Sequence, residues 1–381
     1  MRILHAYKIY RPDIDGGIPA VMSSLSRWSD GNLKQSILCA RRRGTARMLD
    51  IDGVPVEAVG SFGTLFSTPM APGYIPAFIR QARAADVVVH HAPLPLTDMA
   101  ILLGLPRHVA LVVYWHAEII GFPLLKTLVS PMIRRVLARA DQIVVSGQPV
   151  IDHSEFLKPH VDKCVALPYG MDLEYWRTLD VEDHAAIHAL QLAHPRHIVA
   201  LGRLVGYKGF DVLIDAMRDI DGSATIIGEG PLLKELRHLA SERGVADKVR
   251  FAGRLPQRTI KQMLHAAQIF AFPSVNAAEA FGIVQIEAMA AGLPIVNTDL
   301  PTTVPLVARD GLEALTVTPG DARQLSQALT RLLDDPAFAR KLGTAGAARA
   351  FGELDEKLFG SRMLDIYRKA VNTRRILNNP H

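Results

Sequence analysis

The amino-acid sequence predicts an α/β protein built from two doubly wound, Rossmann-like domains. Its 381 residues are 49% hydrophobic and 21% charged, which is enough apolar chain for two domains with substantial cores. Short β-branched runs alternate with segments of helical periodicity, as they do around parallel sheets. The alternation pauses at a polar, histidine-rich stretch, residues 180–197, and then restarts. We therefore expect domains 1–172 and 173–381, and leave open that the last helix packs back on the first domain.

The expected strands are the apolar runs that precede turns or helical segments. In the first domain they are Ile3–Tyr7, Val54–Val59, Asp86–His90, Val109–Tyr114, Gln142–Ser146 and Val165–Pro168. In the second domain they are His197–Leu201, Ala224–Gly228, Val249–Ala252, Ile269–Pro273, Pro294–Asn297 and Leu315–Thr318. Doubly wound sheets bind ligands at the carboxyl ends of their strands, so the residues that follow these runs are candidates for a site.

Net charge and cysteine content narrow the classes of function. A net charge of +5 and a pI near 9.2 favour anionic ligands but fall short of a nucleic-acid-binding profile, so no nucleic-acid partner is expected. Cys39 and Cys164 lie in apolar runs, which predicts buried free thiols rather than a disulfide or a metal site. We see no secretory signal and no apolar window of about 18 residues, and so expect a cytoplasmic protein.

Two carboxylates separated by seven residues, Glu279 and Glu287, flank a small apolar segment of the second domain. The segment is Ala280-Phe281-Gly282-Ile283-Val284-Gln285-Ile286. It predicts a helix that starts near Gly282, whose free first amides and dipole favour an anion. A ligand with a central phosphate and hydroxyl groups on both sides, such as a sugar nucleotide, fits this pattern. The alternative is a surface glutamate and an unrelated helical one.

A glycine-rich segment with two cations follows the expected strand His197–Leu201. Its sequence is Gly202-Arg203-Leu204-Val205-Gly206-Tyr207-Lys208-Gly209. Arginine can bind phosphate oxygens through two parallel hydrogen bonds, lysine acts as a point charge, and glycine lets the backbone approach a ligand. The segment therefore predicts a diphosphate site, with a solvated loop as the alternative.

Three features of the first domain are candidates for ligand or surface binding. Gly16 and Gly17 form a turn after the opening strand that can approach a phosphate or admit an acceptor, or is a plain structural turn. His116 follows the strand Val109–Tyr114. Residues 122–139 are basic and amphipathic, which is typical of segments on anionic membranes and equally of a helix packed on a sheet.

Together, the spaced glutamates, the Gly202–Gly209 segment and the two halves resemble the retaining GT-B glycosyltransferases, particularly family 4, over nearly the whole chain. The resemblance implies an acceptor-binding first domain and a nucleotide-sugar-binding second domain that face each other across a cleft. It implies transfer of a sugar from a nucleotide donor with retained anomeric configuration.

The resemblance also assigns roles to individual residues. Glu279 would bind sugar hydroxyls, Glu287 the ribose, and Arg203 and Lys208 the diphosphate. Gly228-Glu229 looks like the loop near the nucleotide, Arg254-Leu255 looks like the base-contacting turn, and His116 matches the family's active-site histidine. The catalytic candidates are thus His116, Glu279, Arg203 and Lys208. The donor-binding candidates are Gly16, Gly17, Gly202, Arg203, Lys208, Gly228, Glu229, Arg254, Leu255, Glu279, Ala280, Phe281, Gly282, Ile283, Val284 and Glu287.

The chain departs from the family pattern at two places. It has Tyr169-Gly170 where the family often has Asn-Gly, and Pro301-Thr302-Thr303 where a paired glycine is frequent, which weakens inferences about the donor. Asp13-Ile-Asp15 and Asp50-Ile-Asp52 mimic the D-x-D metal motif of the other large glycosyltransferase fold. We interpret them as loop acids, and expect neither a metal nor another cofactor.

The chain looks similar to bacterial mannosyl- and rhamnosyltransferases of surface polysaccharide assembly. This likeness implies a GDP-mannose-like donor, a polyprenyl-diphosphate-linked glycan acceptor, and peripheral contact with the cytoplasmic face of the inner membrane, in lipopolysaccharide or exopolysaccharide synthesis. Two alternatives remain open: a dinucleotide-dependent oxidoreductase, for which no G-x-G-x-x-G turn with a following acid is present, and a catalytically silent GT-B binding module.

Overall fold

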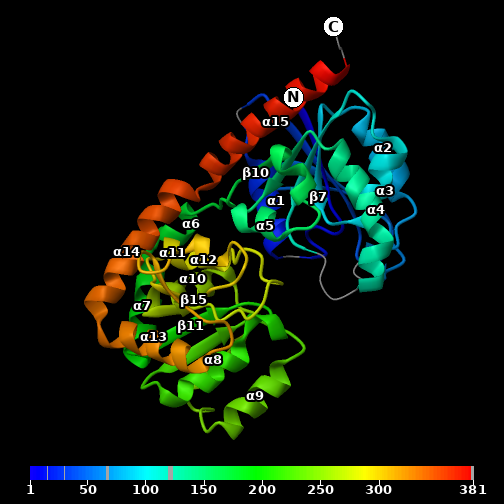
Figure 1. Ribbon diagram of the computed structural model, residues 1–381. Coiled ribbons are helices and arrows are strands. Elements are labelled where there is room, and N and C mark those ends of the chain that lie inside the picture. Colours follow the sequence, from blue (N-terminus) through cyan, green and yellow to red (C-terminus); the bar gives the residue numbers. More distant parts are fainter. Residues whose placement is uncertain (15, 30, 66–67, 119–122, 379–381) are drawn as a thin grey trace. The chain divides into compact units, whose positions relative to one another are not determined.

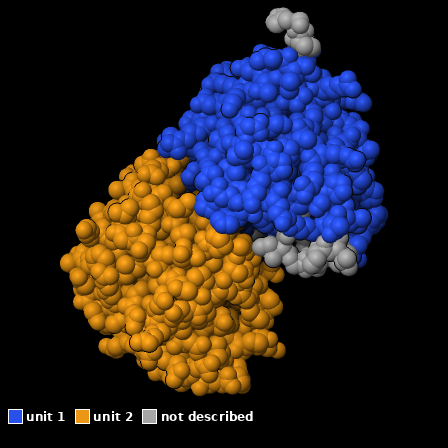
Figure 2. Space-filling model, viewed as in Figure 1, with its two compact units in different colours: residues 1–171, 356–381 blue, residues 172–355 orange. Residues whose placement is uncertain are grey.

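The computed structural model describes residues 1–14, 16–29, 31–65, 68–118 and 123–378, except for the side chains of 123–125. The chain forms two compact units, unit 1 with residues 1–171 and 356–381 and unit 2 with residues 172–355 (Figure 2). The chain first passes from unit 1 to unit 2 after Met171, one residue before the expected boundary after residue 172. The chain crosses again after Asp355, so the last helix belongs to unit 1.

In the described part of unit 1, eight strands form one sheet with the order β10-β9-β8-β7-β1-β2-β4-β3. Neighbouring strands are parallel except β3 and β4. The strands are β1 Arg2–Ala6, β2 Lys34–Ala40, β3 Arg47–Ile51, β4 Val54–Val59, β7 Val87–Ala92, β8 Ala110–Trp115, β9 Gln142–Val145 and β10 Cys164–Ala166, and a separate pair is β5 Thr64–Leu65 and β6 Thr68–Pro69.

Helices cover both faces of this sheet. The helices are α1 Gly17–Arg27, α2 Tyr74–Ala82, α3 Pro95–Gly104, α4 Pro123–Arg139, α5 Gln148–His153, the 3₁₀ helix Lys158–Lys163 and α15 Glu356–Asn378. Buried side chains of α2, α3 and α4 pack with Leu4, Leu111 and Val145 from one face of the sheet. On the other face α15, the red helix of Figure 1, contacts β7, β8, β9 and α1. Because side chains alternate along a strand, His5 and His91 point away from the α2–α4 layer.

Unit 2 contains a parallel sheet with the order β13-β12-β11-β14-β15-β16 among the described residues. Its strands are β11 His197–Leu201, β12 Ser223–Ile227, β13 Val249–Gly253, β14 Ile269–Ala271, β15 Ile295–Thr298 and β16 Ala314–Val317. Its helices are α6 Glu174–Arg177, α7 Val181–Ala193, α8 Phe210–Ala216, α9 Leu233–Glu242, α10 Gln257–Ala266, α11 Val284–Ala290, α12 Val304–Val307, α13 Ala322–Asp334 and α14 Pro336–Glu353, with 3₁₀ helices at Gly206–Lys208 and Met217–Asp219. All carboxyl ends of the strands lie at one edge, which brings the loops after β11, β12, β13 and β14 together.

The structure contains all twelve expected strands, within two residues at each end, and adds elements that were not expected. β2, β3, β5 and β6 were not among the expected strands. β3 pairs antiparallel with β4 through a turn at Asp52 and Gly53, both with positive φ. The polar stretch 180–197 contains a helix, α7, which begins with a capping box formed by Asp180 and Asp183. Both cysteines are free, as predicted; Cys39 is buried, whereas Cys164 was expected to be buried and is only half-buried.

Candidate functional site

The glycine-rich segment of unit 2 is a strand-to-helix turn. After β11 the chain forms a 3₁₀ turn over Gly206–Lys208 and enters α8 at Gly209. Gly209 has φ of 65°, and a Cβ atom there would lie 2.0 Å from the carbonyl oxygen of Pro273. Only glycine satisfies both the backbone conformation and this close approach, which fixes the turn against the loop that follows β14.

Lys208 and Glu279 form an ion pair between these two loops. Each side chain is 11% exposed. The Lys208 Nζ lies 5.0 Å from the centre of the Phe272 ring, and the Ser274 hydroxyl donates to Glu279 Oε2 at 3.2 Å. The structure therefore brings together the cation predicted for the diphosphate and the acid predicted for the sugar.

The loops after β11, β12 and β13 are tied to one another by backbone hydrogen bonds. The amide of Gly228 donates to Gly253 O at 2.9 Å, and the amide of Leu204 donates to Glu229 O at 2.9 Å. A Cβ atom on Gly228 would lie 1.9 Å from Gly202 O. Gly202, Gly228 and Glu229 thus belong to one rigid backbone layer that adjoins Lys208.

Three predicted side chains near this layer point to solvent or lie at its margin. Arg203 and Arg254 are exposed and form no ion pair among the residues that the structure describes, and Leu255 is half-buried. Exposed cations carry their charge to a ligand without first breaking an internal ion pair. Their roles toward a diphosphate and a base remain predictions.

The segment between the two glutamates begins its helix later than expected. Gly282, with φ of 80°, precedes α11, which spans only Val284–Ala290. Within the described residues, the amides of Gly282 and Ile283 have no hydrogen-bond acceptor, while Ala280 O accepts from the amide of Thr303 at 3.1 Å. Phe281 is buried and helps to anchor the segment.

Glu287 lies in the middle of α11 and is half-buried. Among the described residues its carboxyl group has no hydrogen-bond or ion-pair partner, and burial raises the pKa of that group to about 8. A carboxyl group in such a place is desolvated without compensation. Hydroxyl groups of a ligand would supply the missing donors.

His116, Gly16 and Gly17 belong to unit 1. Gly16 caps α1 with φ of 156°, a conformation that favours glycine, and both glycines are exposed. His116 follows β8 and is 2% exposed. Its Nδ1 lies 2.8 Å from the Tyr169 hydroxyl and its Nε2 lies 2.8 Å from His91 Nδ1, so a ligand that bonds the ring would replace one of these partners. Burial lowers the pKa of His116 to about 3.

The side chains that surround His116 were not predicted from the sequence. His5, His91 and Tyr169 complete a buried polar group with it, although none was a predicted site residue. Two adjacent histidines at the end of an apolar strand, His90 and His91, were the available signal. The acids of the D-x-D-like segments have local roles: Asp50 Oδ1 accepts from the Gly53 amide, Asp13 pairs with Arg41, and Asp15 is outside the described residues.

Residues 123–139 of the basic amphipathic segment form α4; Phe122 is outside the described residues. Its apolar side chains Val129, Ile133, Val136 and Leu137 are buried in the core of unit 1, as in an ordinary helix packed on a sheet. Arg134, Arg135 and Leu128 remain exposed. Among the described residues, no helix has the length and apolar character needed to cross a membrane.

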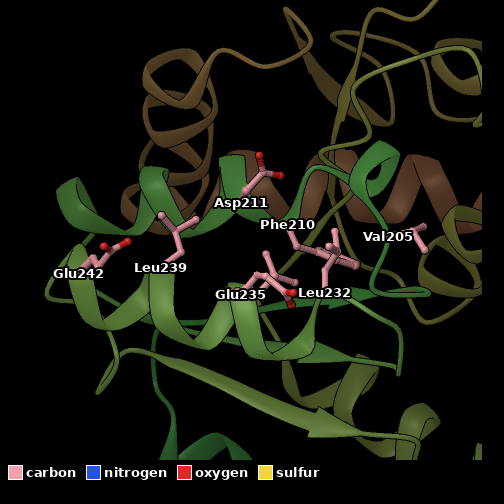
Figure 3. A pocket seen from close by; sticks show the side chains of 8 residues that line it. Val205, Phe210, Asp211, Leu232, Glu235, Leu239 and Glu242 are labelled. Atoms are coloured by element: carbon pink, nitrogen blue, oxygen red, sulfur yellow. The ribbon is translucent and has the colours of Figure 1, made fainter.

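A cavity of about 320 Å³ lies between α8 and α9, apart from these groups. Figure 3 shows Asp211, Glu235 and Glu242 among the apolar side chains that line it. None of its lining residues is a predicted site residue, and three acids suit a diphosphate poorly.

Two family models match the two halves of the chain. The one described as Glycosyl transferase 4-like domain matches residues 16–170, and the one described as Glycosyl transferases group 1 matches residues 188–349. The O-antigen chain mannosyltransferase C of Escherichia coli is 28% identical over 387 residues, which cover 96% of this chain and 97% of that protein. The D-rhamnosyltransferase WbpZ of Pseudomonas aeruginosa is 28% identical over 362 residues, with 92% and 91% covered.

Solved structures show the same fold at low sequence identity. Anabaena Alr3699/HepE in complex with UDP superposes with a TM-score of 0.77 at 19% identity, covering 96% of this chain and 99% of that one. The sucrose-phosphate synthase of Thermosynechococcus elongatus has a TM-score of 0.76 at 19% identity, with 97% and 98% covered. These similarities show two Rossmann-like domains of the GT-B type.

Proposed function

Because this chain belongs to the GT-B glycosyltransferases, with family 4-like and group 1 halves, we propose that it is a retaining hexosyltransferase. It takes the hexose from a nucleotide-diphosphate sugar, with GDP-mannose-like donors favoured. Its acceptor is a polyprenyl-diphosphate-linked glycan in lipopolysaccharide or exopolysaccharide synthesis. Mannose and rhamnose are the favoured sugars.

The single observation that carries this proposal is the buried Lys208–Glu279 pair at the carboxyl edge of the unit 2 sheet. A cation and an acid side by side match a ligand that has a phosphate next to a hydroxylated ring. The glycine layer at Gly202 and Gly228 allows the backbone to approach such a ligand closely. Glu287, which lacks internal donors, suits the ribose hydroxyls.

In the proposed reaction the bond from the anomeric carbon to the diphosphate breaks early. The acceptor hydroxyl enters from the same face and gives its proton to the departing diphosphate oxygen. Negative charge then builds up on the leaving diphosphate. We propose that Lys208 and Arg203, helped by the amides of Gly282 and Ile283, stabilise that charge. Loss of one such preorganised group typically costs about 3 kcal/mol in the barrier, or roughly a hundredfold in rate.

The donor and acceptor proposals rest on the relatives. The Escherichia coli and Pseudomonas aeruginosa relatives described above are named for mannosyl and rhamnosyl transfer, and the name of the first refers to the O-antigen chain. A mannosyltransferase of Corynebacterium glutamicum that is 33% identical over 215 residues, 52% of this chain, is named GDP-mannose-dependent. These names favour a guanosine nucleotide and a glycan acceptor.

Peripheral contact with the cytoplasmic face of the inner membrane is part of the proposal. Arg134 and Arg135 are exposed on α4 and can meet anionic headgroups. The apolar face of the helix is used in the core of unit 1, so the contact is electrostatic rather than an insertion of that face. Such a contact weakens as salt rises.

Radiolabel transfer tests the whole proposal. Labelled GDP-mannose, GDP-rhamnose, UDP-glucose and UDP-galactose are each incubated with the protein and with lipid extracts or soluble sugars. We expect label from a GDP-sugar in the lipid fraction, with the α-anomer of the donor preserved in the product. Lys234→Met, at an exposed lysine of α9, is a control that keeps transfer.

Each negative result would refute a different part of the proposed function. Exclusive use of UDP-glucose would refute the donor proposal, and label only in soluble sugars would refute the acceptor proposal. No transfer from any donor, with nucleotide binding retained, would favour the silent binding module. Loss of transfer in a chelator would contradict the metal-free mechanism, in which Lys208 and Arg203 carry the charge.

A further inference from the structure

Three buried histidines form a continuous hydrogen-bonded chain in unit 1. His5 of β1, His91 of β7 and His116 after β8 lie on the sheet face opposite the α2–α4 layer. His5 Nδ1 lies 3.1 Å from His91 Nε2, and His91 Nδ1 lies 2.8 Å from His116 Nε2. Gln35 closes one end, with Oε1 2.9 Å from His5 Nε2, and the Tyr169 hydroxyl closes the other, 2.8 Å from His116 Nδ1.

The orientation of the Gln35 amide determines the direction of this chain. Its Nε2 lies 2.8 Å from Leu25 O and 2.6 Å from Trp28 O, at the carboxyl end of α1. Carbonyl oxygens only accept hydrogen bonds, so the amide nitrogen faces them and the amide oxygen faces His5. His5 Nε2 must therefore carry the proton and donate to Gln35.

In a neutral imidazole one nitrogen donates and the other accepts, so the direction propagates. His5 Nδ1 is unprotonated and accepts a hydrogen bond from His91 Nε2–H. His91 Nδ1 is therefore unprotonated and accepts from His116 Nε2–H. His116 Nδ1 is unprotonated in turn and accepts from the Tyr169 hydroxyl.

The neutral state of the three rings follows from their surroundings. All three are inaccessible or nearly so, and burial lowers the pKa of His5 to about 4 and that of His116 to about 3. Burial and the neighbouring histidines also hold the pKa of His91 well below its usual value. The rings stack with centroid distances of 5.4 Å and 5.1 Å, which leaves little room for reorientation.

We propose that Gln35, His5 and His91 are positioning residues that hold His116 as the Nε2–H tautomer, with Nδ1 presented as a hydrogen-bond acceptor. In this structure the Tyr169 hydroxyl donates to Nδ1. During turnover a sugar hydroxyl of the substrate replaces the Tyr169 hydroxyl as the donor to Nδ1. His116 then orients a hydroxyl and does not abstract its proton. This role rests on the proposed function, whereas the tautomer does not.

Nitrogen NMR of the protein without substrate tests the tautomer directly. In protein labelled with ¹⁵N in its 14 histidine rings, His116→Gln identifies the His116 signals by their disappearance. We expect His5, His91 and His116 all as Nε2–H rings at neutral pH. A His116 ring that is protonated at Nδ1, or at both nitrogens, overturns the proposal even if sugar transfer is confirmed.

Two nearly isosteric substitutions test the positioning. His5→Asn retains an oxygen near the place of Nδ1 that can accept from His91, whereas His5→Leu does not. We expect His5→Asn to keep the single His116 tautomer and His5→Leu to give a mixture, with kcat at least tenfold lower in His5→Leu and the donor KM changed less. His90→Gln is a matched control on β7, because His90 pairs with Asp98 on the opposite face, and it should leave the His116 signals unchanged.

The other outcomes of these experiments also test the positioning role. If His5→Leu and His5→Asn have the same His116 signals and the same kcat, or if the tautomer changes without a change in kcat, the positioning role is refuted. If His5→Leu does not fold, Gln35→Met removes the amide oxygen that accepts from His5 Nε2, at the half-buried end of the chain, and is judged by the same criteria. If no donor supports transfer, the proposed function fails while the NMR result still tests the chain.

Discussion

At the scale of residues, the buried Lys208–Glu279 pair dominates the energetics of the site. Two charges that are each 11% exposed pay a large desolvation cost, which their mutual attraction and the Ser274 hydroxyl offset. Removal of one partner leaves the other uncompensated. Function and stability are therefore coupled at this pair, and a test has to separate them.

A single and a double substitution achieve this separation. We expect Lys208→Met to lower transfer by roughly a hundredfold or more, and to cost stability because breaking a buried pair costs about 3–5 kcal/mol. Lys208→Met/Glu279→Gln should recover much of the stability in urea unfolding and none of the activity. Transfer by Lys208→Met at nearly the wild-type rate would show that the residue has no role in catalysis.

The raised pKa of the Glu287 carboxyl group predicts that the stability of the protein depends on pH. Burial raises the pKa of its carboxyl group to about 8, from 4.5 in the unfolded chain, so its contribution is complete below pH 4.5 and is lost as pH rises through 8. Glu287→Gln stays neutral and has no such loss. The melting temperature of the variant should therefore rise relative to wild type between pH 4.5 and 8. Parallel melting curves across this range would contradict the raised pKa.

At the scale of elements, glycines decide how closely the loops of unit 2 approach. The turn before α8 contains two glycines with different demands. A Cβ atom added at Gly209 would clash with the carbonyl oxygen of Pro273, and the backbone there has a positive φ. A Cβ atom added at Gly206 would meet no other atom within 4 Å. The two positions form a matched pair within four residues.

We expect Gly209→Ala to lower both stability and transfer, and Gly206→Ala to change neither appreciably. Backbone strain of this kind costs of order 1–3 kcal/mol, and displacement of the turn would also move Lys208. Urea unfolding and the donor KM measure the two effects. Equal stability and KM in the two variants would show that the approach to Pro273 is not constraining.

At the scale of the whole molecule, the last helix of the chain completes unit 1. α15 buries Phe359, Met363, Ile366 and Tyr367, and Arg374 pairs with the buried Asp141 at 2.6 Å. Asp141 also lies 3.3 Å from Arg139. The amino- and carboxyl-terminal parts of the sequence thus share one core, while unit 2 is contiguous.

This arrangement predicts that a change in α15 destabilises unit 1 selectively. Loss of one partner of a buried ion pair lowers the free energy of unfolding by about 3–5 kcal/mol. Arg374→Leu should cost no more than the lower end of this range, because Arg139 remains beside Asp141. Hydrogen exchange should show faster exchange in β8 and β9 and unchanged exchange in β11 and β12. Arg375→Leu, at an exposed neighbour, is the control. Equal protection of β8 in the two variants would contradict the role of the Asp141 pair.

The sequence by itself determined the α/β class, the strands that are buried on both faces, and the glycine and acid motifs of unit 2. Those signals are local: an apolar run predicts a buried strand, and a cation on a glycine turn predicts an anion site. β3 was missed because an edge strand with one solvated face has no apolar run. The Asp52-Gly53 turn was the available local signal for it.

Only the tertiary structure decided which residues meet. Lys208 and Glu279 are separated by 71 positions, and Gln35, His5, His91, His116 and Tyr169 come from five separate segments. Their contacts follow from strand order and register, which bring distant segments into one buried layer. The tautomers of the histidines and the raised pKa of Glu287 depend on that burial, and burial is a property of the packed fold rather than of any one stretch of sequence.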